Sequence, residues 1–478
     1  MRILAAASEI YPLMKTGGLA DVTGALPAAL RPLGVEVRSM VPGYPAVMAG
    51  LKSGKIAHRY AELFGGKAAL VAGKARGLDI IALDAPHLFN RSGNIYLGPD
   101  GKDWPDNGPR FAAFSQAVAD VARGAIKGYA PDILHLHDWQ AALAAVHVKF
   151  GGGPRTVVTV HNIAFQGQFP AHLFAALGLP SAAFGIDGVE FYGNVGFLKG
   201  GLACADAITT VSPSYANEIC TPEFGMGLDG LLRSRRHAVS GIVNGIDTDV
   251  WNPETDTDIA ARFDVSTLEK RGLNKRAVEK RFDLATSDDP LFCVVSRLTW
   301  QKGMDILAAT LDTLVGSGAR LALVGSGESG IEREFLGAAQ QHKGCIGAII
   351  GYDEALSHLM QAGSDAILIP SRFEPCGLTQ LYGLRYGCVP IVARTGGLAD
   401  TIIDANDAGL GAGVATGFQF SPVDGPSLQA ALGRATRVYK SGKAWAMLQK
   451  RGMETDVSWK HSAVAYKELF SNLPEKSA

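Results

Sequence analysis

The sequence predicts an α/β protein with two doubly wound domains, in which parallel strands alternate with helices. Three observations lead to this prediction. The chain has 478 residues, which is more than a single hydrophobic core commonly organises. Short apolar runs alternate with segments of helical periodicity in both halves, an order that indicates parallel sheets with right-handed crossovers. Polar and glycine-rich turns follow many of the apolar runs, and in such sheets ligands bind beyond the carboxyl ends of the strands.

Composition limits the classes of partner. The formal net charge is −1, with 47% apolar and 19% charged residues. This balance suits globular domains with buried sheets, and it provides no overall basic field for a nucleic acid or an anionic membrane. No stretch approaches the ~20 apolar residues that a spanning helix needs. The six cysteines show no C-x-x-C pair, as expected of reduced thiols, so we expect a cytoplasmic protein.

The first half reads as an N-terminal domain over residues 1–245. Apolar and β-branched runs predict strands at 3–7, 35–41, 133–134, 156–160, 207–211 and 238–243. Apolar periodicity predicts helices at 19–30, 111–122 and 140–148. Residues 43–108 contain many Gly and Pro, and we expect them to form an irregular elaboration with loops near a binding face.

The second half reads as a C-terminal domain over residues 246–456, with the crossing near 243–250. Strands are predicted at 291–296, 320–324, 347–350, 366–369 and 389–393, and helices at 304–313, 331–342, 354–362 and 378–386. Residues 248–288 are polar, and we expect them to be mostly helical. The tail, 457–478, has apolar periodicity at 463–470, and we expect it to pack back on the N-terminal domain.

A Gly-Gly turn occurs twice after an apolar run. The sequence KTGGLAD occupies residues 15–21, and RTGGLADT occupies 394–401. Glycines between a strand and a helix allow close approach of a ligand, and the free N–H groups of the helix start attract an anion. One such turn alone is more often an ordinary turn. The repetition, with Lys15 or Arg394 at the start, favours an anion site.

Other polar residues follow the predicted strands: Asp138, His161, Asn162, Arg297, Lys302, Tyr352 and Glu374. A cation at a helix start opposes the helix dipole, so Lys15, Lys302 and Arg394 suggest a bound polyanion such as a diphosphate. Taken one at a time, residues of this set also have purely structural explanations. Glu374 suits a helix N-terminus, and an isolated histidine such as His161 is commonly structural.

The chain resembles the bacterial glycogen synthases and plant starch synthases along essentially its whole length. The motifs that carry the resemblance are SEIYP (8–12), KTGGLADV (15–22), HDW (137–139), TVHN (159–162), VNGID (243–247), SRL (296–298), QKG (301–303), PSRFEPCGL (370–378) and RTGGLADT (394–401). The resemblance implies the GT-B architecture, two Rossmann-like domains that face each other across a deep cleft. The absence of a transit peptide fits a bacterial member.

The resemblance implies an enzyme that transfers glucose from ADP-glucose to the non-reducing end of an α-1,4-glucan such as glycogen, with retention at the anomeric carbon and no cofactor. It assigns catalytic roles to Glu374, His161, Arg297, Lys302 and Asp138. It assigns donor binding to Lys15, Gly17, Gly18, Asn244, Tyr352, Cys376, Gly377, Leu378 and Thr379, and it makes Asp21 and Asn162 possible sugar or acceptor ligands. No metal site is expected. Because we expect the N-terminal domain to hold the acceptor and the C-terminal domain the donor, we expect Lys15 to reach across the cleft when the two domains close.

Several alternatives stay open. A second glutamate, eight positions after the first in many retaining enzymes of this architecture, is replaced here by Tyr382. Retention requires either a covalent sugar–enzyme intermediate, with Glu374 as nucleophile, or departure and attack on one face. A transferase for UDP-glucose or another acceptor, and a non-catalytic nucleotide-sugar sensor, are the other candidate functions. The sequence leaves the oligomeric state open.

Overall fold

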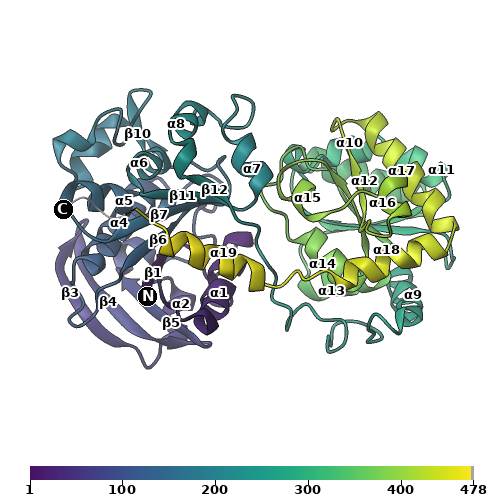
Figure 1. Cartoon of the computed structure of the whole chain (residues 1–478), viewed down its shortest axis with the longest axis horizontal. Coiled ribbons are helices and arrows are strands. Elements are labelled where there is room, and N and C mark those ends of the chain that lie inside the picture. The colour runs from purple at the N-terminus through teal and green to yellow at the C-terminus, as the bar shows by residue number, and fades with distance from the viewer. Residues whose placement is uncertain (475–478) are drawn as a thin grey trace. The chain divides into compact units, whose positions relative to one another are not determined.

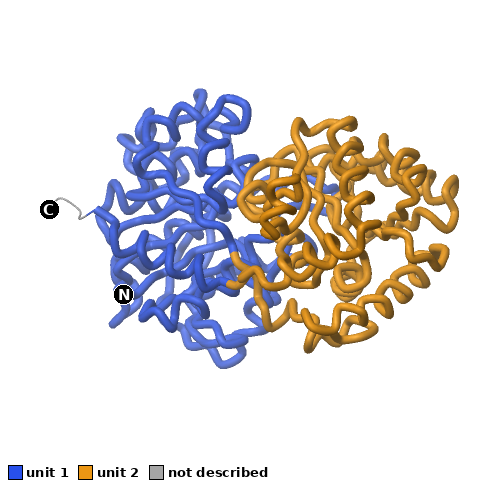
Figure 2. The backbone as a smooth tube through the Cα atoms, turned by 45° about the vertical axis from the view of Figure 1, so that its right-hand side comes forward, with its two compact units in different colours: residues 1–244, 459–478 blue, residues 245–458 orange. Residues whose placement is uncertain are grey.

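The computed structural model describes residues 1–474. The chain forms two compact units (Figure 2). Unit 1 contains Met1–Asn244 together with the C-terminal segment that begins at Trp459, and unit 2 contains Gly245–Ser458. Among the described residues, no helix combines the length and apolar character that crossing a bilayer requires.

Unit 1 contains a nine-stranded sheet (Figure 1). In sheet order its strands are β12 (Val239–Gly241), β11 (Ala207–Thr210), β7 (Arg155–Val160), β6 (Ile133–His137), β1 (Arg2–Ala6), β2 (Glu36–Pro42), β5 (Leu78–Asp84), β4 (Gly66–Ala75) and β3 (Lys55–Leu63). The strands from β12 to β5 run parallel, whereas β4 and β3 are antiparallel. A small sheet combines β8 (Gln168–Phe169), β10 (Asn194–Gly196) and β9 (Glu190–Phe191).

The helices of unit 1 follow the strands as the alternating pattern predicts. They are α1 (Gly18–Leu30), α2 (Pro45–Gly50), α3 (Pro86–Phe89), α4 (Asn107–Ala122), α5 (Asp138–Gly151), α6 (Phe197–Cys204), α7 (Pro213–Glu218), α8 (Asp229–Ser234) and α19 (Lys460–Ser471). Helix α19 lies beside α1 (Figure 1), where Tyr466 and Phe470 share a buried cluster with Leu26 and Leu30. This cluster also contains Ile3 of β1, so α1 and α19 cover one face of the sheet.

The prediction of irregular structure at 43–108 is wrong for the part that forms β3, β4 and β5. These strands are joined by two-residue turns at Phe64–Gly65 and Arg76–Gly77, and all four residues have positive φ, between 50° and 88°. Such turns usually carry Asn or Asp before the glycine. Phe64 and Arg76 occupy these positions instead. The sequence therefore gives no recognisable turn signal, and the two hairpins could not be predicted from it.

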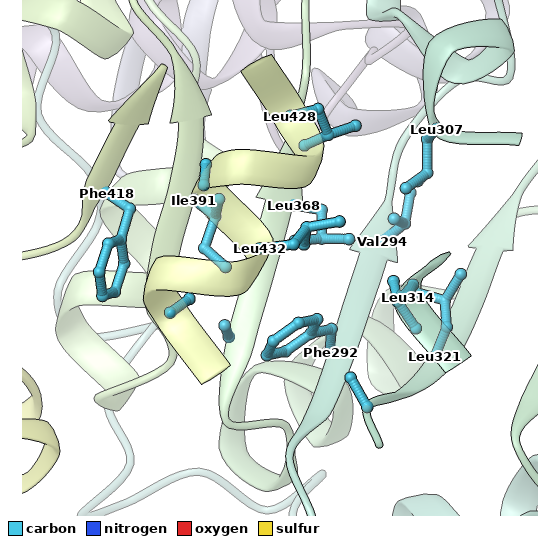
Figure 3. Packing of buried hydrophobic residues seen from close by; sticks show 14 of the residues in the cluster. Phe292, Val294, Leu307, Leu314, Leu321, Leu368, Ile391, Phe418, Leu428 and Leu432 are labelled. Atoms are coloured by element: carbon cyan, nitrogen blue, oxygen red, sulfur yellow. The ribbon is translucent and has the colours of Figure 1, made fainter. Parts of the chain in front are cut away.

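Unit 2 contains a six-stranded parallel sheet. Its order is β15 (Ile346–Ile350), β14 (Arg320–Gly325), β13 (Leu291–Val295), β16 (Ala366–Ile369), β17 (Val389–Ala393) and β18 (Phe418–Phe420). Alternate residues of β13 enter different cores: Phe292 and Val294 lie in one buried cluster and Leu291 and Cys293 in another. The first cluster packs against α17 (Figure 3). Helices therefore cover both faces, as the predicted doubly wound fold requires.

The helices of unit 2 are α9 (Arg271–Arg281), α10 (Met304–Ala308), α11 (Leu311–Gly316), α12 (Ser329–Gln341), α13 (Glu354–Gly363), α14 (Thr379–Tyr386), α15 (Gly396–Thr401), α16 (Asp407–Gly411), α17 (Gly425–Lys440) and α18 (Lys443–Glu454). The expectation that 248–288 is mostly helical is wrong, since regular helix is confined to α9 and a short 3-10 turn before it. Asp247, Asn252, Asp256 and Asp264 instead accept hydrogen bonds from backbone N–H groups two residues on. Such side-chain-to-backbone bonds compete with helix formation.

Candidate functional site

In unit 1, two neighbouring strands bring Asp138 and His161 together. Strands β6 and β7 are paired in parallel, with His137 opposite Thr159. Asp138 begins α5, and its Oδ1 accepts the backbone N–H of His161 at 2.7 Å. Asp138 has a φ of 55°, a conformation that costs about 1–3 kcal/mol for a residue other than glycine. The fold therefore holds this carboxylate at the strand ends in spite of a backbone cost.

Burial controls the ionisation of Asp138. It raises the pKa of this carboxyl to about 7, the negative charge of Glu9 acts in the same direction, and the backbone N–H groups of His161 and Asn162 act against it. Near neutral pH, Asp138 is thus present in both the protonated and the ionised form. A carboxyl with a pKa near the working pH can give a proton to a bound ligand or accept one from it.

His161 contacts a second histidine, His137, which lies in the HDW motif and has no role assigned to it from the sequence. Its Nε2 lies 2.9 Å from Nδ1 of His137. Burial lowers the pKa of His161 to about 3 and that of His137 well below its ordinary value. Both rings are therefore neutral at pH 7. Nδ1 of His161 has no hydrogen-bond partner among residues 1–474, which leaves an uncharged ring nitrogen that can bind a hydroxyl.

Lys15 and Asp21, which the sequence assigned to different ligands, form an ion pair with each other. Nζ of Lys15 lies 2.9 Å from Oδ1 of Asp21, and both side chains are partly exposed. Gly17 precedes α1, and a side chain at this position would meet open space. The N–H groups at the start of α1 have no partners within the helix. An anion that binds at this turn would compete with Asp21 for the Lys15 ammonium group.

Glu9 holds this turn in place, a role that no pattern in the sequence indicates. Its buried carboxylate accepts hydrogen bonds from the backbone N–H of Thr16 at 2.5 Å, the hydroxyl of Thr16 at 2.6 Å and the N–H of Gly17 at 3.2 Å. The hydroxyl of Tyr96 donates to the same carboxylate at 2.6 Å. Glu9 therefore fixes the backbone that precedes α1.

We expect Glu9→Gln to lower the free energy of unfolding by about 1–3 kcal/mol, because the amide keeps one acceptor oxygen in place of two and loses the negative charge that strengthens the four hydrogen bonds. Chemical denaturation measures this loss. Tyr96→Phe, which removes one donor and leaves the carboxylate its other partners, is the matched control with an expected loss of about 1 kcal/mol. Equal losses for the two variants would contradict a role of Glu9 in holding the turn.

In unit 2, Glu374 and Lys302 form a largely buried ion pair. Nζ of Lys302 lies 2.5 Å from Oε2 of Glu374, and Oγ of Ser371 donates to the same oxygen at 2.9 Å. Glu374 follows β16 and Lys302 follows β13, two adjacent strands of the sheet. The structure thus brings together two of the residues that the sequence placed at strand ends.

Close backbone packing sets the position of Lys302. Gly303 has a φ of 66°, and a Cβ at this position would lie 1.9 Å from the carbonyl oxygen of Pro370. The backbone N–H of Arg372 donates to the carbonyl of Gln301 at 2.9 Å. Lys302 ends a 3-10 turn rather than occupying the first turn of a helix. Lys302 also directly precedes Gly303, the N-cap of α10, so its charge lies at a helix start and is balanced by Glu374.

The second Gly-Gly turn serves a different purpose from the first. A Cβ at Gly396 would lie 2.0 Å from the carbonyl oxygen of Glu374, and one at Gly397 would lie 2.2 Å from that of Cys376. These glycines let the turn pack against the backbone that carries Glu374. Gly17, in contrast, faces open space. The two turns therefore differ in structure although their sequences are similar. The repetition does not by itself indicate two anion-binding sites.

The remaining sequence-predicted residues of unit 2 lie on loops at the same end of the sheet. Cys376 is buried, Gly377 has a φ of 71°, and Leu378 precedes Thr379, the first residue of α14. The ring of Tyr352 is 73% exposed. Arg297 is exposed after β13. Exposed cationic and aromatic side chains and the free N–H groups of a helix start suit a nucleotide with phosphate groups.

Asn244, the last residue of the first segment of unit 1, is buried, and its amide oxygen has no hydrogen-bond partner in the described part of the chain. A buried polar atom without a partner is costly, so this oxygen is suited to accept a ligand hydroxyl.

Tyr382 takes part in a stack of three rings. The indole of Trp251 lies between Tyr382 and His358, with ring centroids 3.7 Å and 3.8 Å away. The position eight residues after Glu374 is therefore used for packing.

His358 also belongs to a group with Asp256 and Asp258 whose ligand atoms lie within 4.8 Å of one another. Asp256 already accepts hydrogen bonds from Tyr386 and pairs with His358, which explains this group structurally.

Comparisons with known proteins assign the two units to families. Residues 2–234 match the family described as the starch synthase catalytic domain, and residues 276–435 match glycosyl transferases group 1. A glycogen synthase of Mesorhizobium japonicum is 58% identical over 478 residues, which cover 100% of this chain and 99% of the relative. Glycogen synthase 1 of Rhizobium meliloti is 57% identical over 479 residues, with 100% of both chains covered.

Solved structures give the same assignment. The catalytic domain of starch synthase IV from Arabidopsis thaliana, bound to ADP and acarbose, superposes with a TM-score of 0.86 at 33% identity and covers 98% of each chain. Sucrose-phosphate synthase from Thermosynechococcus elongatus matches at 15% identity with a TM-score of 0.58, over 99% of this chain and 98% of that one, and supports the fold alone. The predicted pair of Rossmann-like domains is confirmed.

Proposed function

The chain belongs to the family of glycogen synthases and starch synthases, and from that premise we propose that it transfers glucose from ADP-glucose to the non-reducing end of an α-1,4-glucan, with retention of the anomeric configuration. It is a glycosyltransferase. The observation that carries the proposal is the similarity over the full length to a glycogen synthase, at 58% identity. The ion pair of Lys302 and Glu374 supplies a matching chemical centre.

In this proposal unit 2 binds the donor. Cleavage of the glucose–phosphate bond builds negative charge on the departing diphosphate, and Arg297 and Lys302 supply positive charge to stabilise it. The backbone N–H groups near Gly377 and Thr379 add hydrogen bonds at the start of α14. The exposed ring of Tyr352 packs on the adenine base. Glu374, held by Lys302 and Ser371, lies beside the transferred glucose.

Unit 1 provides groups for the sugar hydroxyls. Asp138, once ionised, accepts a hydrogen bond from a hydroxyl, and the neutral ring of His161 offers Nδ1. Asn162 and Asp21 are further candidates for contact with sugar or acceptor. We assign Lys15, the Gly17–Gly18 turn and the amide oxygen of Asn244 to the donor. The cations provide the charge stabilisation, so the proposal includes no cofactor besides the donor substrate.

One assay tests the proposal: purified protein with glycogen and equal concentrations of ADP-glucose or UDP-glucose, with nucleotide release and the product anomer followed together. We expect rapid ADP release only when glycogen is present, slower use of UDP-glucose, and α-linked product. Faster release of UDP would assign the enzyme to the other donor. Binding of ADP-glucose without turnover, in the presence of glycogen, would favour a sensor and contradict the proposal.

A further inference from the structure

Strand β6 carries two buried histidines, His135 and His137, on the same face of the sheet of unit 1. Their ring centroids lie 4.1 Å apart, and the ring of His135 also packs against Tyr466 and Phe470 of α19, with centroids 5.4 Å away. Nε2 of His135 is hydrogen-bonded to the hydroxyl of Thr159 at 2.7 Å. His135 is thus held by its own contacts, and its ring packs firmly against that of His137.

The ring of His137 is hydrogen-bonded to the ring of His161. Nδ1 of His137 lies 2.9 Å from Nε2 of His161, and the ring centroids are 5.2 Å apart. In the described part of the chain, Nε2 of His137 has no hydrogen-bond partner. The ring lines a cavity of about 10 Å³ whose walls are mainly apolar, with Ile3, Leu26 and Leu30 among them. This volume is about the least that a water needs, and the walls give a water few polar partners.

Burial keeps all three rings neutral. It lowers the pKa of His135 and of His161 to about 3, and that of His137 well below its ordinary value. A neutral imidazole carries one proton, so of the two nitrogens that face each other one donates and the other accepts. If His161 donated through Nε2, the proton of His137 would lie on its own Nε2, a buried N–H without an acceptor. Buried N–H groups without a partner are rarer than buried acceptors without one, which favours His137 as the donor.

We propose that His137 is a positioning residue, whose Nδ1–H donates to Nε2 of His161 and thereby keeps the proton of His161 on Nδ1, available to an oxygen of the bound sugar. This inference rests on the proposed function. Asp138, whose Oδ1 accepts the backbone N–H of His161 at 2.7 Å, supplies an acceptor at the same strand ends. A sugar hydroxyl both donates and accepts, so a donor on His161 beside an acceptor on Asp138 matches it. Two acceptors side by side would compete for the one hydroxyl proton.

The tautomer of His161 can be observed without any substrate. Long-range proton–nitrogen NMR spectra of protein with isotope-labelled histidine distinguish protonated from unprotonated ring nitrogens, and the loss of one set of signals in His161→Gln identifies His161 among the 11 histidines. We expect the ligand-free protein to carry a proton on Nδ1 of His161 and none on Nε2. A proton on Nε2 of His161, alone or together with one on Nδ1, would overturn the inference.

Two replacements of similar shape test the direction of the hydrogen bond by kinetics. The side-chain N–H₂ of His137→Asn can take the place of Nδ1–H, whereas the ionised carboxylate of His137→Asp can only accept. We expect His137→Asn to keep kcat for glucosyl transfer within about 3-fold of the wild type. We expect His137→Asp to lower kcat by about 10- to 100-fold, the effect of one lost hydrogen bond at a reacting group. Equal kcat values for the two variants would overturn the inference.

A third variant separates positioning from folding. His137→Leu places an apolar side chain among apolar neighbours, so we expect it to melt no lower than His137→Asn and still to lose about as much kcat as His137→Asp. Values of kcat that follow the melting temperatures of the three variants, rather than the presence of a donor, would overturn the inference. His237→Asn, at an exposed histidine before β12, is the control and should retain full activity. An inactive wild type would instead contradict the proposed function, and the spectra of the ligand-free protein would still decide the tautomer.

Discussion

Replacement of Glu374 by alanine is expected to lower kcat for glucosyl transfer by at least about 100-fold, a loss of a few kcal/mol of transition-state stabilisation. We expect a loss of the same order for Lys302→Ala. The two charges lie 2.5 Å apart with little exposure, so the removal of either one leaves the other buried without its partner. Nucleotide release in the presence of glycogen measures both variants.

The double variant shows whether the two residues act as a unit. If they do, the combined loss in Lys302→Ala/Glu374→Ala will be clearly smaller than the sum of the two single losses. Glu334→Ala, which removes an exposed carboxylate from α12, is the control for handling and folding and should retain full activity. Near-normal ADP release by either single variant would contradict the assigned role of the pair.

The order of strands and helices can be predicted from the sequence because parallel sheets bury both faces of each strand. The strands then appear as short apolar runs, such as Ile133–Leu134 before His137 and Asp138. Residues after such runs share one edge of the sheet, which is why Asp138 and His161, or Lys302 and Glu374, could be named together. This inference uses only the alternation of elements and the direction of the strands.

Contacts that depend on distant parts of the chain could not be predicted. Glu9 precedes the Lys15 turn by a few residues, but its partner Tyr96 is 87 positions away. The two Gly-Gly turns are nearly identical in sequence, yet the second packs against the backbone of Glu374 and the first faces open space. A local pattern shows that a backbone has room for a close approach, and only the tertiary structure shows what approaches.

Asp138 provides a prediction in which activity and stability respond in opposite directions. Asp138→Asn should lower kcat by about 100-fold, because a neutral amide cannot supply negative charge to the sugar. In the wild type, kcat/KM should rise with pH up to about 7 as Asp138 ionises. His161 cannot cause this acid limb, since burial keeps the pKa of its ring near 3.

The effect on stability follows from the direction of the pKa shift. The pKa of Asp138 is raised on folding from 3.8 to about 7, so the folded state binds the proton more tightly than the unfolded state does. The stability that this proton contributes is complete below about pH 4 and is lost as the pH rises to about 7. The asparagine side chain does not titrate and therefore suffers no such loss.

Thermal unfolding between pH 5 and pH 8 checks this expectation. The melting temperature of Asp138→Asn, relative to that of the wild type at the same pH, should increase steadily up to about pH 7 and then level off. Any cost of placing the amide N–H₂ near the N–H of Asn162 is independent of pH, so the trend isolates the buried charge. If the difference in melting temperature between Asp138→Asn and the wild type stays constant or decreases across this range, Asp138 is already ionised well below pH 7. Another residue would then have to cause the loss of kcat/KM at acid pH.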